Sequence, residues 1–128
     1  GPITEEVRTG EQVFGALGCS SCHVPSLTTG ASASAAVSRK TVPLFSDLLL
    51  HDIGTGDGIA QEAASPSEIR TPALWGLRFR RPLMHDGSAM TPPEAIRQHG
   101  GEAQAVMQRL NRATDQMRRA LFAFLDSL

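Results

Sequence analysis

The sequence predicts an all-α domain whose helices are joined by long irregular loops. Apolar residues recur at helical spacing near both ends of the chain, and no segment shows the sustained alternation that is typical of a strand. Many of the 12 glycines and 8 prolines lie between these ends, where they indicate turns. A length of 128 residues suits one domain, so residues 1–128 are treated as a single unit. Gly1 and Pro2 have the form of a scar left by a tag-removal protease, as expected for a domain excised from a larger protein.

The first expected helix covers residues 4–17. Thr4 is a suitable N-cap, and the two glutamates that follow it favour the positive end of the helix dipole. Gly10 is costly within a helix, so its presence indicates the close approach of a second helix. Gly18 ends the segment. The apolar face consists of Val7, Val13, Phe14 and Leu17.

The middle of the chain predicts mostly loops, with two short helices. Residues 24–43 are rich in Ser, Ala, Thr and Gly and are expected to form a surface loop. A short helix is expected over residues 46–51, with Ser46 as its cap. The glycines within residues 54–58 predict a tight, mobile loop. A second short helix is expected to begin at Pro72, because proline suits the first helical position.

Three helices are expected in the last third of the chain. The tetrapeptide Thr91-Pro92-Pro93-Glu94 combines a cap, prolines in the first turn and a glutamate at the third helical position. The helix that it starts is expected to stop at Gly100-Gly101, and residues 102–112 form the next one. Thr114 caps the final helix, whose apolar face consists of Met117, Leu121, Phe124, Leu125 and Leu128.

Composition and charge exclude several classes of function. Twelve basic and 13 acidic residues give a net charge of −1, which argues against a general nucleic-acid-binding protein. No apolar run approaches the roughly 20 residues needed to span a bilayer, so no transmembrane segment is expected. The chain does not open on a charged and then apolar leader. Aromatic residues make up only 5% of the chain, so either the core is small or a bound group fills part of it.

The pentapeptide Cys19-Ser20-Ser21-Cys22-His23 contains both cysteines of the chain, and four explanations compete. A disulfide would close only a tiny loop and would stabilise the fold little. A thioredoxin-like redox pair requires a preceding strand, whereas a helix is expected here. A zinc site requires four ligands, and no second Cys or His pair follows at short spacing. The fourth explanation, covalent haem attachment, matches the C-x-x-C-H signature and is the one that the sequence favours.

The spacing of this motif fits the chemistry of haem c. Each thiol adds to one haem vinyl group, and two intervening residues let both sulfurs reach the two vinyls from one turn of chain. His23 follows at once and supplies the proximal imidazole to the iron. One haem c, bound covalently through Cys19 and Cys22, is therefore the expected cofactor, and its apolar bulk would compensate for the few aromatic side chains.

Five further segments are specific in combination: LFSDLLLHDIG (44–54), RTPALWGL (70–77), HDGS (85–88), EAIRQHGG (94–101) and LDSL (125–128). Together they resemble the C-terminal haem domain of the di-haem oxidoreductase group, which is similar to bacterial di-haem cytochrome c peroxidases. The resemblance runs from about Gly10 to the end of the chain. It implies a cytochrome c-like fold, in which the first and last helices cross at nearly right angles. Di-haem members have two haem motifs and this chain has one, so the resemblance implies the electron-entry half.

The sixth ligand of the iron has two main candidates. From the residues alone Met84 and His99 are equally good, because Met84 lies in an irregular segment and His99 ends a helix beside two glycines. The resemblance favours His99, since the distal ligand of the similar peroxidases falls fourteen residues after the histidine that matches His85. Ligation by His23 and His99 would give a six-coordinate, low-spin iron with a lower reduction potential than His/Met ligation. His51 and His85 are expected to make structural hydrogen bonds or to contact a haem propionate.

The haem propionates need hydrogen-bond donors. Arg70 and Arg78 can each bind a carboxylate through two parallel N–H groups, and Arg80 and Arg81 are further candidates. Trp75 can donate its indole N–H.

These observations predict a single-haem electron-transfer domain rather than a complete enzyme. It would exchange one electron with a partner redox protein or a fused oxidative enzyme, and it is expected to be a monomer. Two alternatives stay open, the electron-entry half of a di-haem peroxidase or oxidoreductase and a peroxide-reactive haem protein with an open iron. Because bacteria attach haem c outside the cytoplasm, the expected location is the periplasm, the cell surface or the medium.

Overall fold

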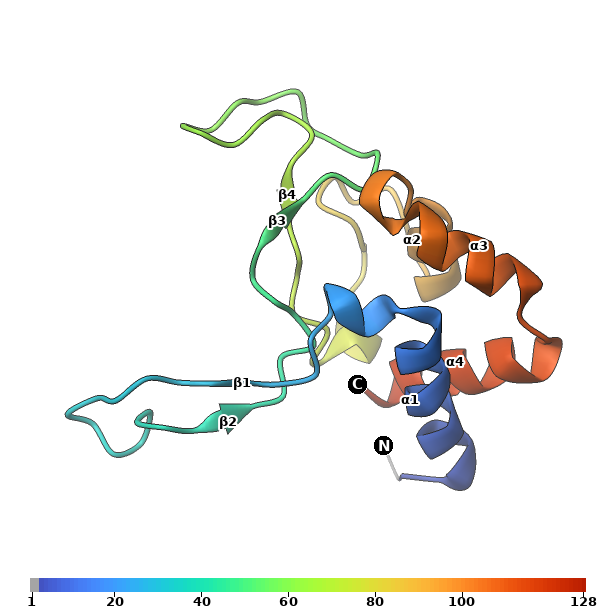
Figure 1. Cartoon of the computed structure of the whole chain (residues 1–128), viewed down its shortest axis with the longest axis horizontal. Helices are drawn as coiled ribbons and strands as arrows, with labels where there is room; N and C mark the ends of the chain where they lie inside the picture. The colour runs from blue at the N-terminus through green and yellow to red at the C-terminus, as the bar shows by residue number, and fades with distance from the viewer. Residues whose placement is uncertain (1–2) are drawn as a thin grey trace.

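The computed structural model describes residues 3–128, which form a helical body from which two loops project (Figure 1). Over these residues the α-helices are α1 (Glu5–Leu17), α2 (Pro92–Arg97), α3 (Gln104–Arg112) and α4 (Asp115–Ser127). The 3-10 helices are η1 (Cys19–Ser21), η2 (Leu77–Phe79) and η3 (Gly101–Ala103). Two short antiparallel pairs join β1 (Leu27–Thr28) to β2 (Thr41–Val42) and β3 (Leu50–His51) to β4 (Ile69–Arg70).

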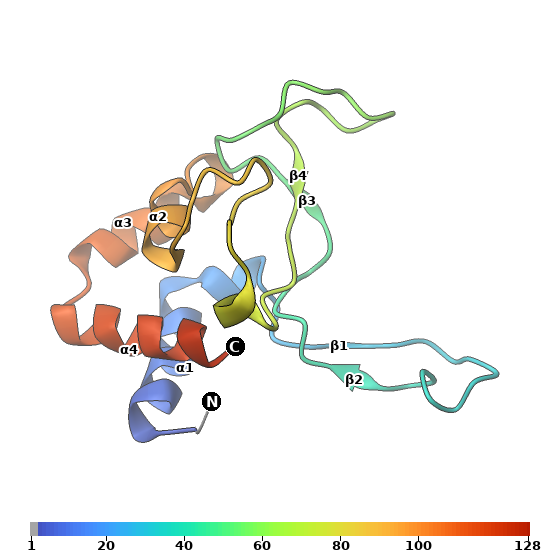
Figure 2. The same ribbon diagram turned by 180° about the vertical axis from the view of Figure 1, so that it is seen from behind.

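Helices α1 and α4 come from opposite ends of the chain and cross in contact with each other (Figures 1 and 2). The hydroxyls of Thr4 and Thr114 accept backbone N–H groups and cap the two helices, as predicted. Gly10 lies at the crossing, where an added Cβ would lie only 2.6 Å from the Cβ of Phe124. Since real side chains do not approach so closely, a glycine is required there, and the predicted close approach of a second helix is confirmed.

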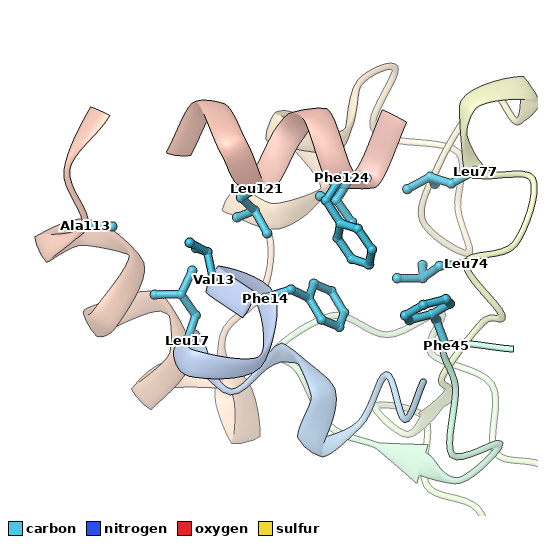
Figure 3. Packing of buried hydrophobic residues seen from close by; sticks show 10 residues of the cluster. Val13, Phe14, Leu17, Phe45, Leu74, Leu77, Ala113, Leu121 and Phe124 are labelled. Carbon is cyan, nitrogen blue, oxygen red and sulfur yellow. The ribbon is translucent and has the colours of Figure 1, made fainter. Parts of the chain in front are cut away.

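The hydrophobic core lies where α1 and α4 meet the loops that carry Phe45 and Leu74 (Figure 3). Phe14, Phe45 and Phe124 form its aromatic centre, with tilted rings whose centroids are 5.3 to 6.1 Å apart. Such edge-to-face arrangements stabilise a core beyond the effect of burial alone. Three of the six aromatic residues thus form the centre of the core, whereas Trp75 and Phe79 are exposed. The other buried members are Val13, Leu17, Leu74, Leu77, Ala113, Leu121 and Leu125.

Both short helices predicted for the middle of the chain are wrong. Residues 46–49 are irregular, with Leu48 in a left-handed conformation of φ +62°. The Ser46 hydroxyl donates to the carbonyl of Thr71 at 2.8 Å while it accepts the Leu48 N–H at 2.9 Å. The segment ends as strand β3, so its pairing with β4 outweighs the local helical signal. No helix begins at Pro72 among the described residues, and only η2 forms a few residues later.

The predicted surface loop over residues 24–43 is exposed but more ordered than expected. Strands β1 and β2 close it into a hairpin that projects from the body (Figure 2). The second projection consists of residues 54–68, which include the predicted glycine-rich loop. Long irregular connections are therefore confirmed, although the expectation of no strands is wrong for these two short pairs.

The C-terminal third follows the predicted order with different boundaries. The predicted capping box is present, because the Thr91 hydroxyl accepts the Glu94 N–H and the Glu94 carboxylate accepts the Thr91 N–H. Helix α2 ends at Arg97, so His99 follows the helix instead of lying within it. The helix predicted for residues 102–112 is divided into η3 and α3. No helix in the described part of the chain is long and apolar enough to cross a membrane.

Candidate functional site

Helix α1 places the two cysteines beside the core. It ends at Gly18, whose φ of +93° is a left-handed conformation that glycine adopts without strain. The chain then turns through η1, and the backbone N–H of His23 donates to the carbonyl of Cys19 at 3.0 Å. Cys19 and Cys22 are free thiols and both are partly buried. One turn of chain thus carries the two thiols and the histidine, as the motif predicts.

Arg109 of α3 holds the start of this turn. Its Nε donates to the carbonyl of Leu17 at 2.7 Å, at the end of α1. An added Cβ at Gly18 would lie 2.5 Å from the guanidinium, so the arginine packs directly on the glycine. Burial raises the pKa of the Cys19 thiol to about 11, against the opposing effect of the nearby Arg109 charge. Cys19 is therefore a neutral thiol in this structure at pH 7.

His23 is oriented by the loop that follows β2. Its Nδ1 lies 3.0 Å from the carbonyl oxygen of Phe45, and because a carbonyl can only accept, Nδ1 carries the proton. The other ring nitrogen, Nε2, then has a free lone pair. Burial lowers the pKa of His23 to about 4, so the ring is neutral at pH 7. A neutral imidazole with an oriented Nδ1–H is the form in which histidine binds a metal.

His99 has the same arrangement. Its Nδ1 lies 2.9 Å from the carbonyl oxygen of Ala95, which is in α2, so Nδ1 carries a proton and Nε2 is the nitrogen that could bind a metal. The His99 ring lies near enough to His23 to oppose the protonation of His23 electrostatically. In both predicted ligands a backbone carbonyl therefore orients the ring through Nδ1, and Nε2 is the nitrogen that points away from that bond. Ligation of one iron by the two histidines stays a prediction.

This set of donors fits haem c. Two thiols one turn apart suit the two vinyl groups, and His23 and His99, whose Nδ1 atoms are both bonded to backbone carbonyls, would hold the iron through Nε2. The Phe14 ring packs against the His23 ring with centroids 6.3 Å apart, which gives the proximal side an apolar wall.

A carboxylate–imidazole–carboxylate group lies beside Cys22. His51 Nε2 is 2.7 Å from Asp47 Oδ2, and His51 Nδ1 is 2.9 Å from Glu102 Oε2. Donor atoms of Cys22, Asp47 and His51 lie within 4.8 Å of one another. The hydrogen bonds to Glu102 and then to Asp47 raise the pKa of His51. Burial acts to raise the pKa of Asp47, but the hydrogen bonds from His51 and Leu49 outweigh it and lower that pKa.

The structural hydrogen bonds expected of His51 are confirmed, but the sequence analysis missed their partners. Asp47 and His51 are four residues apart, within the segment for which the sequence predicts a short helix. Glu102 is 51 residues from His51, and no local pattern links the two. The backbone carbonyls of Phe45 and Ala95 were also missed, since any residue type supplies a carbonyl.

The predicted propionate contacts lie on the surface. Arg70, Trp75 and Arg78 are exposed, and the Arg78 guanidinium stacks 4.4 Å above the ring of Phe79. Arg80 and Arg81 donate instead to the carbonyls of Ala73 and Leu77. Contacts of Arg70, Trp75 and Arg78 with propionates stay predictions.

The alternative ligand, Met84, is partly buried and has a left-handed backbone with φ +67°. It lies in the turn that also carries the exposed His85. The structure describes no partner that would orient the thioether sulfur toward His23, in contrast to the hydrogen bond that orients His99.

Comparison with known proteins gives a family and a fold. Residues 2–128 match the family described as "Di-haem oxidoreductase, putative peroxidase". The chain is similar to the crystal structure of a MauG-like protein associated with microbial copper homeostasis, with a TM-score of 0.58 and 23% identity. That match covers 99% of this chain and 47% of the other, so this chain spans about half the length of that structure. No curated protein matches the chain.

Proposed function

Because the chain belongs to the di-haem oxidoreductase family, we propose that it is a single-haem electron-transfer domain of that family. Cys19 and Cys22 would bind one haem c covalently, and His23 and His99 would ligate its iron. The observation that supports this most is the matched pair of imidazoles. Both have Nδ1 tied to a backbone carbonyl and Nε2 left for a metal, and they come from opposite parts of the chain.

A bound haem c supplies one-electron redox chemistry, and the residues of this chain would restrict it to that chemistry. His23 and His99 would both ligate the iron, which would leave no open coordination position for peroxide or oxygen. The carbonyls of Phe45 and Ala95 hold the Nδ1 protons and thereby fix the direction of each Nε2 lone pair. Phe14 and Phe45 exclude water from the proximal side, since both rings are buried in the core.

The partner in this proposal is a second redox domain, either fused to this one or in the same compartment. The sequence of the complete gene tests this, because a second C-x-x-C-H upstream or downstream would make the chain the electron-entry half of a di-haem oxidoreductase.

We also propose that the domain is a monomer located outside the bacterial cytoplasm, where haem c is attached. A version kept in the cytoplasm should carry no haem after denaturation, while an exported one should.

Absorption spectra of the purified haem protein test the function directly. The oxidised and reduced forms are recorded with and without carbon monoxide and cyanide. Sharp low-spin bands, no far-red sulfur-to-iron band and no response to carbon monoxide are expected for His23/His99 ligation. A far-red band would indicate Met84 as the ligand and a higher reduction potential. A high-spin spectrum that changes with carbon monoxide would reject the electron carrier in favour of a peroxide-reactive protein.

A further inference from the structure

One segment of the chain makes hydrogen bonds at or next to both proposed ligands, His23 and His99. We define residues 45–54 as the strap. At its start, the carbonyl of Phe45 accepts from His23 Nδ1 at 3.0 Å, and the N–H of Asp47 donates to the carbonyl of Cys22 at 2.8 Å. At its end, the carbonyl of Ile53 accepts the N–H of Gly100, the residue after His99, at 2.6 Å. The strap therefore connects the proximal and the distal side of the proposed haem site.

The distal end of the strap is in direct backbone contact with Gly101, in the turn that follows His99. Gly101 has a φ of +47°, and an added Cβ there would collide with the carbonyl oxygen of Asp52 and lie 3.0 Å from the nitrogen of Gly54. The N–H of Glu102 donates to the same Asp52 carbonyl at 2.9 Å. The turn that follows His99 thus has no space to move toward the strap, and hydrogen bonds from Gly100 and Glu102 oppose its movement away.

His51 adds a side-chain connection between the two sides. Its Nε2 bonds to Asp47, whose N–H holds Cys22, and its Nδ1 bonds to Glu102, which follows the turn after His99. Glu102 also accepts the N–H of Asp52 through its second oxygen at 2.9 Å. Because carboxylates accept and do not donate when ionised, both ring nitrogens donate and the ring is an imidazolium between two negative charges. The His51 and Asp47 side chains are 17% and 11% exposed, so water replaces the bond between them poorly, whereas the Glu102 side chain is 56% exposed and its bond to His51 is open to water.

We propose that His51 is a positioning residue, which sets the separation of His23 and His99 by joining Asp47 to Glu102 across the strap. The inference rests on the proposed function, because it concerns how two ligands of one iron are held at the correct distance. It assigns a role to a histidine that does not touch the iron. Loss of the bridge would leave the covalent attachment and the proximal ligand in place and would free the distal turn.

The experiment compares the haem-loaded wild type with His51→Phe, which fills similar space and cannot bridge the carboxylates. Leu49→Phe is the matched control, since it places the same ring in the strap at a side chain that is 61% exposed. We expect His51→Phe to retain covalent haem but to lose the pure low-spin ferric spectrum, to bind carbon monoxide when reduced, and to recover the low-spin spectrum with added imidazole. Leu49→Phe should behave like the wild type.

A His51→Phe protein that unfolds at lower temperature but keeps the wild-type spectrum and reduction potential would overturn the inference, because it would show a purely structural role. If His51→Phe does not fold or load haem, Glu102→Gln decides. This variant keeps the Asp47–His51 bond and weakens only the bond between His51 and residue 102, so a partial high-spin spectrum is expected. An unchanged spectrum would again show that His51 does not position the ligands. A wild type that is already high-spin or ligated by Met84 would instead reject the proposed function, and the inference with it.

Discussion

At the scale of single residues, the tautomer of His99 is the most consequential detail of the structure. A proton on Nδ1, held by the Ala95 carbonyl, makes Nε2 the atom that would bind the iron in the proposed function. We predict that His99→Ala keeps its covalent haem, because Cys19 and Cys22 are untouched, but becomes high-spin and binds carbon monoxide. Absorption spectra with carbon monoxide measure this. Met84→Leu is the control and should leave the spectrum unchanged. A high-spin spectrum for Met84→Leu together with an unchanged spectrum for His99→Ala would identify Met84 as the ligand.

A second residue-scale prediction concerns pH. The pKa of His51 is raised by its bonds to Glu102 and Asp47, so the folded protein binds this proton more tightly than the unfolded chain. The resulting stabilisation is complete below about pH 6.5, the usual value for histidine, and is lost as the pH rises through the higher folded value. Hydrogen bonds lower the pKa values of Asp47 and Glu102, so their contribution is present above about pH 4.5 and is lost in acid.

Denaturant titration of the haem-loaded wild type and of His51→Phe isolates this effect. The difference in unfolding free energy between the two proteins should be largest at about pH 5–6 and should shrink toward alkaline pH. The third neighbour of the ring, Cys22, does not titrate once it forms a thioether. A difference that grows with pH would show that His51 is not held as an imidazolium.

At the scale of elements, the crossing of α1 and α4 depends on one glycine. Gly10→Ala would place a methyl group against Phe124 and the Ala120 backbone, so the helices must separate. We predict a loss of about 1–3 kcal/mol in unfolding free energy. Gly15→Ala is the matched control in the same helix, because nothing lies within 4 Å of its added Cβ. It should stabilise the protein by about 0.5–1 kcal/mol through helix propensity, as thermal or denaturant unfolding would show.

The cap of α2 is a second element with a measurable role. Thr91 and Glu94 satisfy each other's backbone N–H groups, and α2 also supplies the Ala95 carbonyl that orients His99. We predict that Thr91→Ala lowers the unfolding free energy by about 1 kcal/mol. Thr91→Ser retains the hydroxyl and should keep most of the wild-type unfolding free energy. An equal loss in both variants would mean that packing of the threonine methyl, and not the cap, stabilises the helix.

At the scale of the whole molecule, the body and its projections have different roles. The hairpin beyond β1 and β2 contacts its own residues, as in the bond from the Arg39 N–H to the Gly30 carbonyl at 3.0 Å. Its tip lies far from the core in both views (Figures 1 and 2). We predict that replacing residues 31–38 with Asn-Gly changes the unfolding free energy by less than about 1 kcal/mol and leaves the haem spectrum unchanged. A changed spectrum would show that the hairpin acts on the site.

Features that depend on a few neighbouring residues could be predicted before the structure was known. The caps of α1, α2 and α4 are such features, because each joins a side chain to a backbone N–H three residues away. The C-x-x-C-H turn and the glycine at the helix crossing are others. Local helical preference was misleading at residues 46–51, where a strand partner about twenty residues later outweighs it.

Features that depend on distant partners required the folded chain. The carbonyl of Phe45 meets His23 across 22 residues, and the carboxylate of Glu102 meets His51 across 51. Nothing in the local sequence marks such pairs, because any residue can supply a carbonyl and exposed carboxylates are common. The sequence thus identified which groups could bind haem, since that information is chemical and local. The orientation of the two imidazoles and the strap between them arise only when distant segments pack, because packing sets the distances between them.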